Sequence, residues 1–425
     1  MRILLGCQYY APSVGGVQEV MRQIAERLVA WGHQVTVATT QLPARDFEVL
    51  NGVAIKEFRI SGNLVSGMAG EIEEYQEYAV AGDFDIVMIM AAQQWTFDAL
   101  WPVLNRMKCR KVFVPCGFSS FYEPAYAKYF QQLPGVLRKI DRLVFHSAKY
   151  RDIDFVREQG MDNFSIIPVG ASEDIFNVAA DVLFKARHGI PAESFLFLTV
   201  GSFTGLKGHL ELVKAFSRLE LAEGQHATLI LNGNDVQILD RSIGGLVGKF
   251  IGLIRTYGVQ SSFERILEKL FGLGDTPQRI ANLINKSRPN KLVLVTNFPR
   301  HELTQAFMAA DLFVFASNVE YSPLVLYESA AAGTPFLSVN VGNAEEIARW
   351  TGAGVICPST VDEKGYTRVD EVALAQSMAE LMQQKDWLAT LGATGKKNWS
   401  ERFTWETITR QYEYLFQQLL ESSHT

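Results

Sequence analysis

Short apolar runs alternate with amphipathic stretches along most of this chain. Residues 2–9 are mostly apolar, and a loop with two adjacent glycines follows them. Apolar residues then recur at helical spacing, at Val17, Val20, Ile24, Leu28 and Trp31. Gly32 is the kind of residue that ends a helix, and the apolar run 34–40 comes directly after it. The pattern therefore predicts a strand, a loop, a helix and a second strand, which is the first unit of an open parallel sheet.

A second series of the same kind begins at residue 194. In the first half of the chain, further apolar runs cover 84–92, 110–117, 140–147 and 164–170. In the second half they cover 194–201, 226–234, 290–298, 310–317 and 334–340. We therefore expect an α/β protein with two doubly wound domains, at 1–180 and 190–395, followed by a C-terminal amphipathic helix over 396–425.

Residues 237–287 are more than an α/β unit needs between two strands. The segment is rich in Ile, Leu, Phe and Gly, with basic residues interspersed. One alternative is a helical insertion that packs on its own domain, as apolar helical stripes usually do. The other is an interfacial helix, within residues 241–273, whose basic residues face anionic lipid. Its glycines weaken helix formation in both cases.

The composition narrows the class of protein. Apolar residues make up 48% and charged residues 20%, which is ordinary for a globular protein. A formal net charge of −6 argues against a general nucleic-acid binder. The four cysteines are scattered without a C-x-x-C pair, which favours reduced thiols in a cytosolic protein over a zinc site. No apolar run is long enough to cross a bilayer, and we do not expect the first residues to act as a signal peptide.

Two glutamates bracket the mostly apolar stretch EYSPLVLYE, which lies between two of the predicted strands. Ser322 and Pro323 are typical of the residue that caps a helix and of the first helical position. We therefore expect a helix that contains Glu328 and ends at Gly333. Glu320 then lies in the loop that enters this helix.

The start of this helix is a candidate anion site. The N–H groups near Leu324 and Val325 have no acceptor within the helix, and the positive end of the helix dipole lies there. Carboxylates on each side of a bound phosphate can hydrogen-bond sugar hydroxyls, as a nucleotide-sugar requires. The alternative is that Glu320 and Glu328 only cap and solvate the helix start.

These residues resemble the E-x7-E motif of the retaining glycosyltransferases of family GT4, which have the GT-B fold. Four other stretches resemble that family in the same order, so the resemblance covers nearly the whole chain: PSVGGVQEVMRQIAERLVAWGHQVTVATT, PVGASEDIF, VGSFTGLKGHLELVKAF and GTPFLSVNVGNAEEI. The resemblance implies two Rossmann-like domains that face a central cleft. The N-terminal domain would bind the acceptor and the C-terminal domain the nucleotide-sugar, and the cleft would close by domain rotation.

The resemblance also implies roles for single residues. Glu320 should contact the transferred sugar, and Lys207 should neutralise the diphosphate leaving group. The residues implied in donor binding are Glu328 at the ribose, Gly15, Gly16, Ser202, Ser322, Leu324 and Val325 around the donor, and Phe298 and Arg300 near the base. Without side chains, Gly15 and Gly16 let their loop approach the phosphates closely. Lys207 could instead be a solvated surface charge, and the two glycines could be simple turn residues.

Four positions depart from the family pattern. Ser202 stands where the family usually has an arginine paired with the lysine. Cys116 precedes Gly117 in a loop where many members have a histidine near the transferred sugar. YSP follows Glu320 in place of GFG, and Gly342 is followed by asparagine in place of a second glycine. These departures leave open the donor and the use of the usual phosphate clamp.

The sequence thus predicts a retaining glycosyltransferase of the hexosyltransferase type. It would move a sugar from a nucleotide-sugar to a saccharide, lipid-linked or small-molecule acceptor, as in polysaccharide biosynthesis. No cofactor and no metal are expected, because no D-x-D lies in a suitable loop, and no nucleic-acid partner is expected. We expect a cytoplasmic protein, at the inner face of the membrane if residues 241–273 contact lipid. The alternatives are a GT-B nucleotide-sugar epimerase and a non-catalytic sugar-binding GT-B protein.

Overall fold

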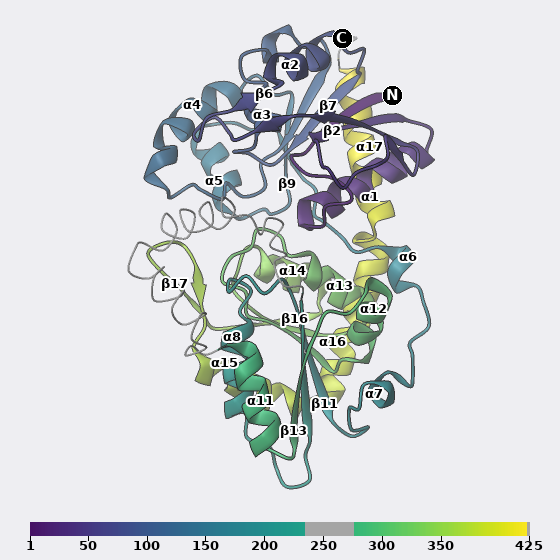
Figure 1. Cartoon of the computed structure of the whole chain (residues 1–425), viewed down its shortest axis with the longest axis vertical. Coiled ribbons are helices and arrows are strands. Elements are labelled where there is room, and N and C mark those ends of the chain that lie inside the picture. Colours follow the sequence, from purple (N-terminus) through teal and green to yellow (C-terminus); the bar gives the residue numbers. More distant parts are fainter. Residues whose placement is uncertain (234–275, 423–425) are drawn as a thin grey trace.

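The computed structural model describes residues 1–233 and 276–422. Two parallel sheets dominate these residues, and each has helices on both faces (Figure 1). We call the part with the larger sheet, residues 1–170, the N-terminal half. The part with the smaller sheet, from Phe195 to Arg402, is the C-terminal half. The two halves lie one above the other along the longest axis of the molecule.

The sheet of the N-terminal half has eight strands in the order β10-β9-β8-β7-β1-β2-β4-β3. All neighbours in it are parallel except β3 and β4. The strands are β1 (Arg2–Gly6), β2 (Gln34–Thr40), β3 (Val49–Leu50), β4 (Val53–Phe58), β7 (Ile86–Met90), β8 (Arg110–Val114), β9 (Arg142–Phe145) and β10 (Phe164–Ile166). The longer helices are α1 (Gly16–Ala30), α2 (Ile72–Ala81), α4 (Ala127–Leu137) and α5 (Arg151–Glu158).

The sheet of the C-terminal half has six parallel strands in the order β13-β12-β11-β14-β15-β16. They are β11 (Phe195–Val200), β12 (Ala227–Asn232), β13 (Lys291–Thr296), β14 (Leu312–Phe315), β15 (Phe336–Val339) and β16 (Gly354–Cys357). The helices are α8 (His209–Arg218), α11 (Pro277–Ser287), α12 (Arg300–Ala309), α13 (Leu324–Ala332), α14 (Ala344–Thr351), α15 (Glu371–Met382) and α16 (Lys385–Arg402). A small hairpin, β17 (Thr360–Val361) and β18 (Thr367–Arg368), lies beside them.

The apolar runs of the sequence form the centres of both sheets. In β7 and β12 all residues are buried, as expected for strands covered by helices on both faces. The first predicted unit is confirmed, because β1, α1 and β2 follow one another at the expected positions and α1 buries Val20, Ile24 and Leu28. Two short strand pairs were not predicted. They are β3 with β4, and β5 (Ile60–Ser61) with β6 (Ala69–Gly70).

The chain returns to the N-terminal half at its C-terminal end. Helix α17 (Trp405–Glu421) runs along α1, shown in yellow beside purple in Figure 1, and Glu413 of α17 binds His33 at 2.7 Å. The helix predicted over 396–425 therefore begins at Trp405, and residues 396–402 belong to α16. The interruption between α16 and α17 lies at Phe403. There the Phe403 carbonyl accepts a hydrogen bond from the Ala171 N–H at 3.0 Å, in the segment by which the chain first passes from the N-terminal to the C-terminal half.

Of the predicted insertion 237–287, only the end is described. Helix α11 begins after Thr276, whose hydroxyl accepts a hydrogen bond from the Arg279 N–H. It forms the crossover between β12 and β13, so this part belongs to the ordinary α/β unit. The segment 241–273 lies outside the described residues. Within the described residues, no helix combines the length and apolar character that a membrane crossing needs.

Candidate active site

Helix α13 supplies the first-turn N–H groups that the sequence predicted for Leu324 and Val325. The prediction that Ser322 caps this helix is wrong, because Pro323 occupies the capping position and makes no side-chain cap. Pro323 has an extended backbone with ψ of 113°, so the helix begins one residue later than expected. The helix ends as predicted at Gly333, whose φ of 78° suits glycine.

Glu320 and Lys207, the two predicted catalytic residues, lie in direct contact. The Lys207 ammonium is 2.6 Å from the Glu320 carboxylate, which also accepts a hydrogen bond from the Ser317 hydroxyl at 2.9 Å. Gly208 makes this approach possible. Its φ is 72°, and a Cβ there would lie 1.9 Å from the Ala316 carbonyl oxygen. The loop after β11 thus packs on the end of β14, and the lysine meets the loop that carries Glu320.

Glu328 and Arg300 form a second ion pair. Glu328 is 8% exposed and lies on α13, whereas Arg300 is the first residue of α12 and stacks over the ring of Phe176. The charge of Glu328 raises the pKa of Arg300 above its ordinary value. The structure therefore brings together the residues that the resemblance implied at the ribose and near the base.

Phe298 and Ser202 lie on the loops that follow β13 and β11, the two strands on either side of β12 in the sheet. The Phe298 N–H donates to the Asn232 side chain at 2.8 Å, and its ring packs 4.8 Å from that of His188. Ser202 lies between β11 and α8, where its carbonyl accepts a hydrogen bond from Thr204. Both loops follow the carboxyl ends of parallel strands, where ligands of open α/β sheets usually bind.

The glycine loop of the N-terminal half faces the start of α13. A Cβ on Gly16 would lie 4.0 Å from Leu324, so the first turns of α1 and α13 approach each other across the join. Gly15 precedes α1 in an extended conformation, and a Cβ there would come within 2.6 Å of the Gln18 side chain. Two helix N-termini therefore lie close together, which is favourable for an anion.

The Cys116–Gly117 loop also reaches the E-x7-E segment. Both residues have positive φ, 59° and 85°. A Cβ on Gly117 would lie 2.8 Å from the ring of Tyr321, the residue after Glu320. Burial raises the pKa of the Cys116 thiol, which keeps it protonated at neutral pH. A neutral thiol thus stands where the resemblance placed a residue near the transferred sugar.

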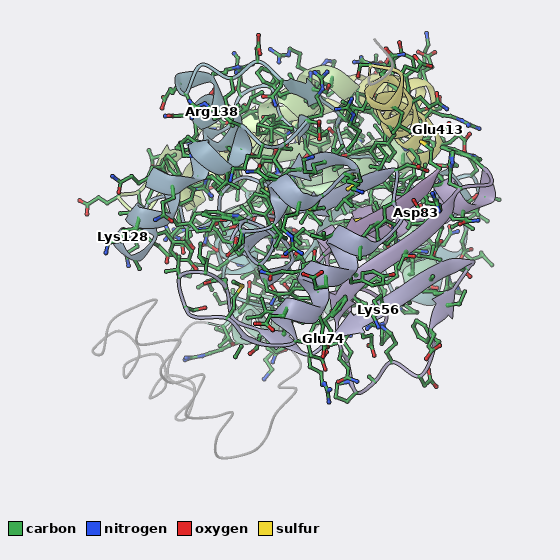
Figure 2. The ribbon with its side chains drawn as sticks, turned by 90° about the horizontal axis from the view of Figure 1, so that it is seen from above. Lys56, Glu74, Asp83, Lys128, Arg138 and Glu413 are labelled. Carbon is green, nitrogen blue, oxygen red and sulfur yellow. The ribbon has the colours of Figure 1, made fainter. Side chains whose placement is uncertain are left out.

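Several residues at the join were not predicted. A pocket of about 300 Å³ lies between Lys149 and Tyr150 of the N-terminal half and Glu320, Gly342 and Glu346 of the C-terminal half. Lys149 and Tyr150 come from a segment without a recognisable local motif, whereas Gly342 and Glu346 lie in the stretch GTPFLSVNVGNAEEI, where the asparagine after Gly342 could have drawn attention to them. A larger hollow of about 700 Å³ lies elsewhere, beside β4 and α2, where Figure 2 labels Lys56 and Glu74.

No metal site is evident in the part of the chain that the structure describes. Among residues 1–233 and 276–422, no group of three His, Cys, Asp or Glu side chains is arranged to hold a metal ion. The positively charged groups at the candidate site are Lys207 and Arg300, and two helix N-termini lie beside them.

Comparison with known families identifies the chain. The family described as Glycosyltransferase Family 4 matches residues 14–174, and the family described as Glycosyl transferases group 1 matches residues 183–386. The chain is a GT4-like group 1 glycosyltransferase. The enzyme class predicted from the E-x7-E segment is confirmed, and the two matches meet where the chain first crosses between the halves.

Relatives of this glycosyltransferase support the same assignment. A D-inositol 3-phosphate glycosyltransferase of Thermobispora bispora is 24% identical, over 96% of this chain and 91% of its own. The solved sucrose-phosphate synthase of Thermosynechococcus elongatus is similar with a TM-score of 0.69 at 19% identity, over 99% of both chains. Anabaena HepE in complex with UDP-glucose has a TM-score of 0.66 at 15% identity, over 99% of this chain and 100% of that one. These structures confirm the GT-B fold.

Proposed function

We propose that this glycosyltransferase transfers a sugar from a nucleotide-sugar to an acceptor hydroxyl and retains the anomeric configuration. The observation that carries the proposal is the meeting of the first turns of α1 and α13 beside two ion pairs, Lys207 with Glu320 and Arg300 with Glu328. A diphosphate bound there would accept hydrogen bonds from N–H groups of both helices. Retention is what membership of the GT4-like group implies.

Lys207 and Glu320 exchange partners in this proposal. When the diphosphate binds, the Lys207 ammonium turns from Glu320 to the phosphate oxygens and neutralises the charge that develops as the bond from sugar to phosphate breaks. Glu320 is then free to accept a hydrogen bond from a hydroxyl of the sugar. Because Ser202 replaces the usual arginine, Lys207 and the helix N-termini carry the neutralisation without a second cation from that position.

Glu328 and Arg300 take the nucleoside end of the donor in this arrangement. Glu328 lies on α13 behind its first turn, so its carboxylate is placed to accept hydrogen bonds from ribose hydroxyls next to the diphosphate. Arg300 holds that carboxylate and lies near Phe298 at the start of α12. The HepE complex with UDP-glucose supports the class of donor, a nucleotide-sugar, and we propose no metal or cofactor for the reaction.

The acceptor is proposed to be a saccharide, a lipid-linked sugar or a small molecule, bound on the side of the N-terminal half. A relative named D-inositol 3-phosphate glycosyltransferase supports a small-molecule acceptor, and one named glycogen synthase supports a saccharide. We also propose a cytoplasmic protein that contacts the inner face of the membrane through residues 241–273. The support is the sequence alone, in which Arg and Lys are interspersed among apolar residues. Failure of the full chain to sediment with anionic vesicles at low salt would contradict the membrane contact.

The decisive experiment is a matrix of nucleotide-sugars and acceptors with release of the nucleoside diphosphate as the readout. A glycosyltransferase releases it only when donor and acceptor are both present, and product analysis by NMR gives the anomeric configuration. Isomerisation without an acceptor would indicate an epimerase, and donor binding without turnover would indicate a binding protein. Glu320→Gln is the matched variant, because it keeps the shape and removes the charge; we expect at least a hundredfold loss of turnover.

A further inference from the structure

The join between the two halves centres on the side chain of Tyr321. Its hydroxyl accepts a hydrogen bond from the His146 N–H at 3.0 Å and donates one to the Asp152 carboxylate. Its ring lies 5.1 Å from the ring of Tyr150 and directly against Gly117. A residue of the C-terminal half is therefore inserted among four residues of the N-terminal half.

The backbone next to this tyrosine is fixed as well. The Tyr150 hydroxyl donates to the Glu320 carbonyl at 2.8 Å, and the Asn343 N–H donates to the Tyr321 carbonyl at 2.9 Å. A Cβ on Gly342 would lie 2.4 Å from that same carbonyl oxygen, so no bulkier residue fits behind it. The two peptide groups that flank Tyr321 are thus each held by a hydrogen bond, one from Tyr150 and one from Asn343.

Asp152 connects this segment to the Cys116–Gly117 loop. It is fully buried, and its carboxylate accepts a hydrogen bond from the Gly117 N–H at 2.8 Å in addition to the Tyr321 hydroxyl. A buried carboxylate is costly unless it is well hydrogen-bonded. Apart from the adjacent Ile153 N–H, its partners are the residue after Cys116 and the residue after Glu320, the two positions that the family resemblance implies near the transferred sugar.

We propose that Tyr321, seated on Asp152, is a positioning residue that holds Glu320 in register with the Cys116–Gly117 loop across the domain join. This role rests on the proposed function and deepens it, because it says what holds the Glu320 loop and the Cys116–Gly117 loop in fixed relative positions around the sugar. Catalytic groups must be held to within about 0.5 Å of the productive geometry, and these two come from different halves. We call the hydrogen bonds of Asp152 with Tyr321 and Gly117 the Tyr321–Asp152 clamp. This clamp fixes the position of Glu320 relative to the Cys116–Gly117 loop.

The join has a second attachment that does not depend on Tyr321. Glu346 accepts hydrogen bonds from the Ser147 hydroxyl at 2.5 Å and the Ala148 N–H at 3.0 Å. Loss of the tyrosine hydroxyl alone therefore leaves the halves attached. Tyr321→Phe keeps the ring in its place and removes only the link to Asp152 and His146, which makes it a mild and specific variant.

The test compares Tyr321→Phe and Asp152→Asn with Tyr75→Phe as the matched control. Tyr75 is a buried tyrosine whose hydroxyl donates to the Thr96 carbonyl at 2.7 Å, away from the join. We expect Tyr321→Phe and Asp152→Asn each to lower kcat by about tenfold to a hundredfold, as a small misplacement of catalytic groups does, with the KM of the donor within twofold. Tyr75→Phe should leave kcat and KM unchanged.

Amide hydrogen exchange of the same proteins, without any substrate, gives an independent readout. In Tyr321→Phe and Asp152→Asn, exchange should accelerate at Gly117 and in residues 317–323, and Tyr75→Phe should not change it there. If the wild type turns over no nucleotide-sugar, the proposed function fails while this readout still decides whether the clamp exists. Wild-type kcat together with wild-type exchange in Tyr321→Phe would overturn the inference.

Discussion

Lys207 changes partners in the proposed reaction, which gives a prediction about single substitutions. Its ammonium lies 2.6 Å from Glu320, on a loop that packs on the end of β14. We expect Lys207→Ala to weaken binding of a nucleoside diphosphate by about 1.5–3 kcal/mol, the usual worth of a hydrogen bond to a charged group. Binding of the nucleoside alone should change much less. Calorimetric titration with UDP and with uridine measures both.

Lys128→Ala is the control for that titration, since Lys128 lies exposed on α4 of the N-terminal half, as Figure 2 shows, and takes no part in the ion pair. It should leave both affinities unchanged. Equal affinity of wild type and Lys207→Ala for UDP would show that the lysine does not contact the phosphates. The assignment of the site would then have to rest on the helix N-termini alone.

His146 gives a second residue-scale prediction, about pH. Burial lowers its pKa to about 4, and its Nδ1 bonds the Ile167 carbonyl at 2.8 Å. In the unfolded chain the pKa is about 6.5, so the wild type loses stability as the pH falls from about 6.5 towards 4. A His146→Asn variant lacks this loss. We therefore expect its stability deficit relative to wild type to shrink by about 2–3 kcal/mol between pH 7.5 and pH 4.5.

Urea unfolding of the two proteins across that range measures the difference. Burial raises the pKa of Asp98 and Asp152 to about 6, and both act in the opposite direction, because they favour the folded state as the pH falls. They are present in wild type and variant, so the comparison isolates His146. A deficit that stays constant from pH 7.5 to pH 4.5 would mean that the pKa of His146 is the same in the folded and the unfolded chain.

The candidate site shows what the sequence could predict and what it could not. The E-x7-E spacing and the helix signals after Glu320 are local, so the position of α13 followed from neighbouring residues. The pairing of Glu320 with Lys207 joins residues far apart in the chain, and no local pattern encodes it. Asp152 lies in KYRDIDF, a stretch without a motif, and its role depends on a tyrosine that comes much later in the chain.

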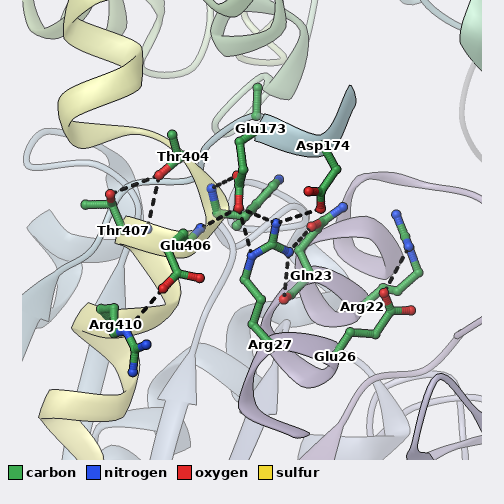
Figure 3. A network of polar contacts seen from close by, with 12 residues as sticks. Arg22, Gln23, Glu26, Arg27, Glu173, Asp174, Thr404, Glu406, Thr407 and Arg410 are labelled. Carbon is green, nitrogen blue, oxygen red and sulfur yellow. Dashed lines mark hydrogen bonds and ion pairs between the residues drawn. The ribbon is translucent and has the colours of Figure 1, made fainter. Parts of the chain in front are cut away.

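At the scale of elements, one carboxylate holds three helices together (Figure 3). Glu173 is the first residue of α6 (Glu173–Phe176), and its carboxylate lies 2.6 Å from the guanidinium of Arg27 on α1. The same carboxylate accepts hydrogen bonds from the N–H groups of Trp405 and Glu406 at the start of α17. Glu173→Ala should lower the free energy of unfolding by about 2–4 kcal/mol, because it leaves the largely buried Arg27 and two N–H groups without this acceptor. Urea titration followed by circular dichroism measures it.

Arg22→Ala is the matched control on the same helix. Arg22 pairs with Glu19 and Glu26 on the surface of α1, and its side chain is 33% exposed. Such a surface pair is worth at most about 1 kcal/mol, so the control should cost clearly less than Glu173→Ala. Equal losses in the two variants would show that α17 is held by its apolar face, with residues such as Tyr412 and Phe416, rather than by this carboxylate.

Elements with continuous apolar runs were predictable, and those set by distant contacts were not. Strand β2 lies at the predicted residues 34–40 because it is central and covered on both faces. Strand β4 lies near the edge of the sheet and is half-exposed, so its sequence lacks such a run. The division between α16 and α17 depends on the contact of Ala171 with Phe403, which interrupts a stretch that is amphipathic throughout.

At the scale of the whole molecule, polar contacts such as those of Tyr321 and Glu346 join the two halves, and domain motion is the usual expectation for a polar join. The chain crosses between them only near residues 171–193 and 403–404 within the described part, and these crossings lie beside each other at Ala171 and Phe403. That arrangement is suited to a hinge. The polar contacts of Glu346 lie at the join itself and hold the halves in the arrangement that the structure shows.

Loss of Glu346 should therefore open the molecule. It is 4% exposed and accepts hydrogen bonds from the Ser147 hydroxyl and the Ala148 N–H. Truncating one partner of such a buried charged contact costs about 2–5 kcal/mol, enough to reverse a closed population. We expect Glu346→Ala to have a larger radius of gyration in small-angle X-ray scattering than the wild type, and Ser147→Ala to increase it less.

Glu345→Ala is the control. Glu345 is an exposed neighbour on α14, so this variant should scatter like the wild type. Identical scattering of wild type and Glu346→Ala, with and without UDP, would show that apolar packing at the join, not this carboxylate, sets the arrangement of the halves.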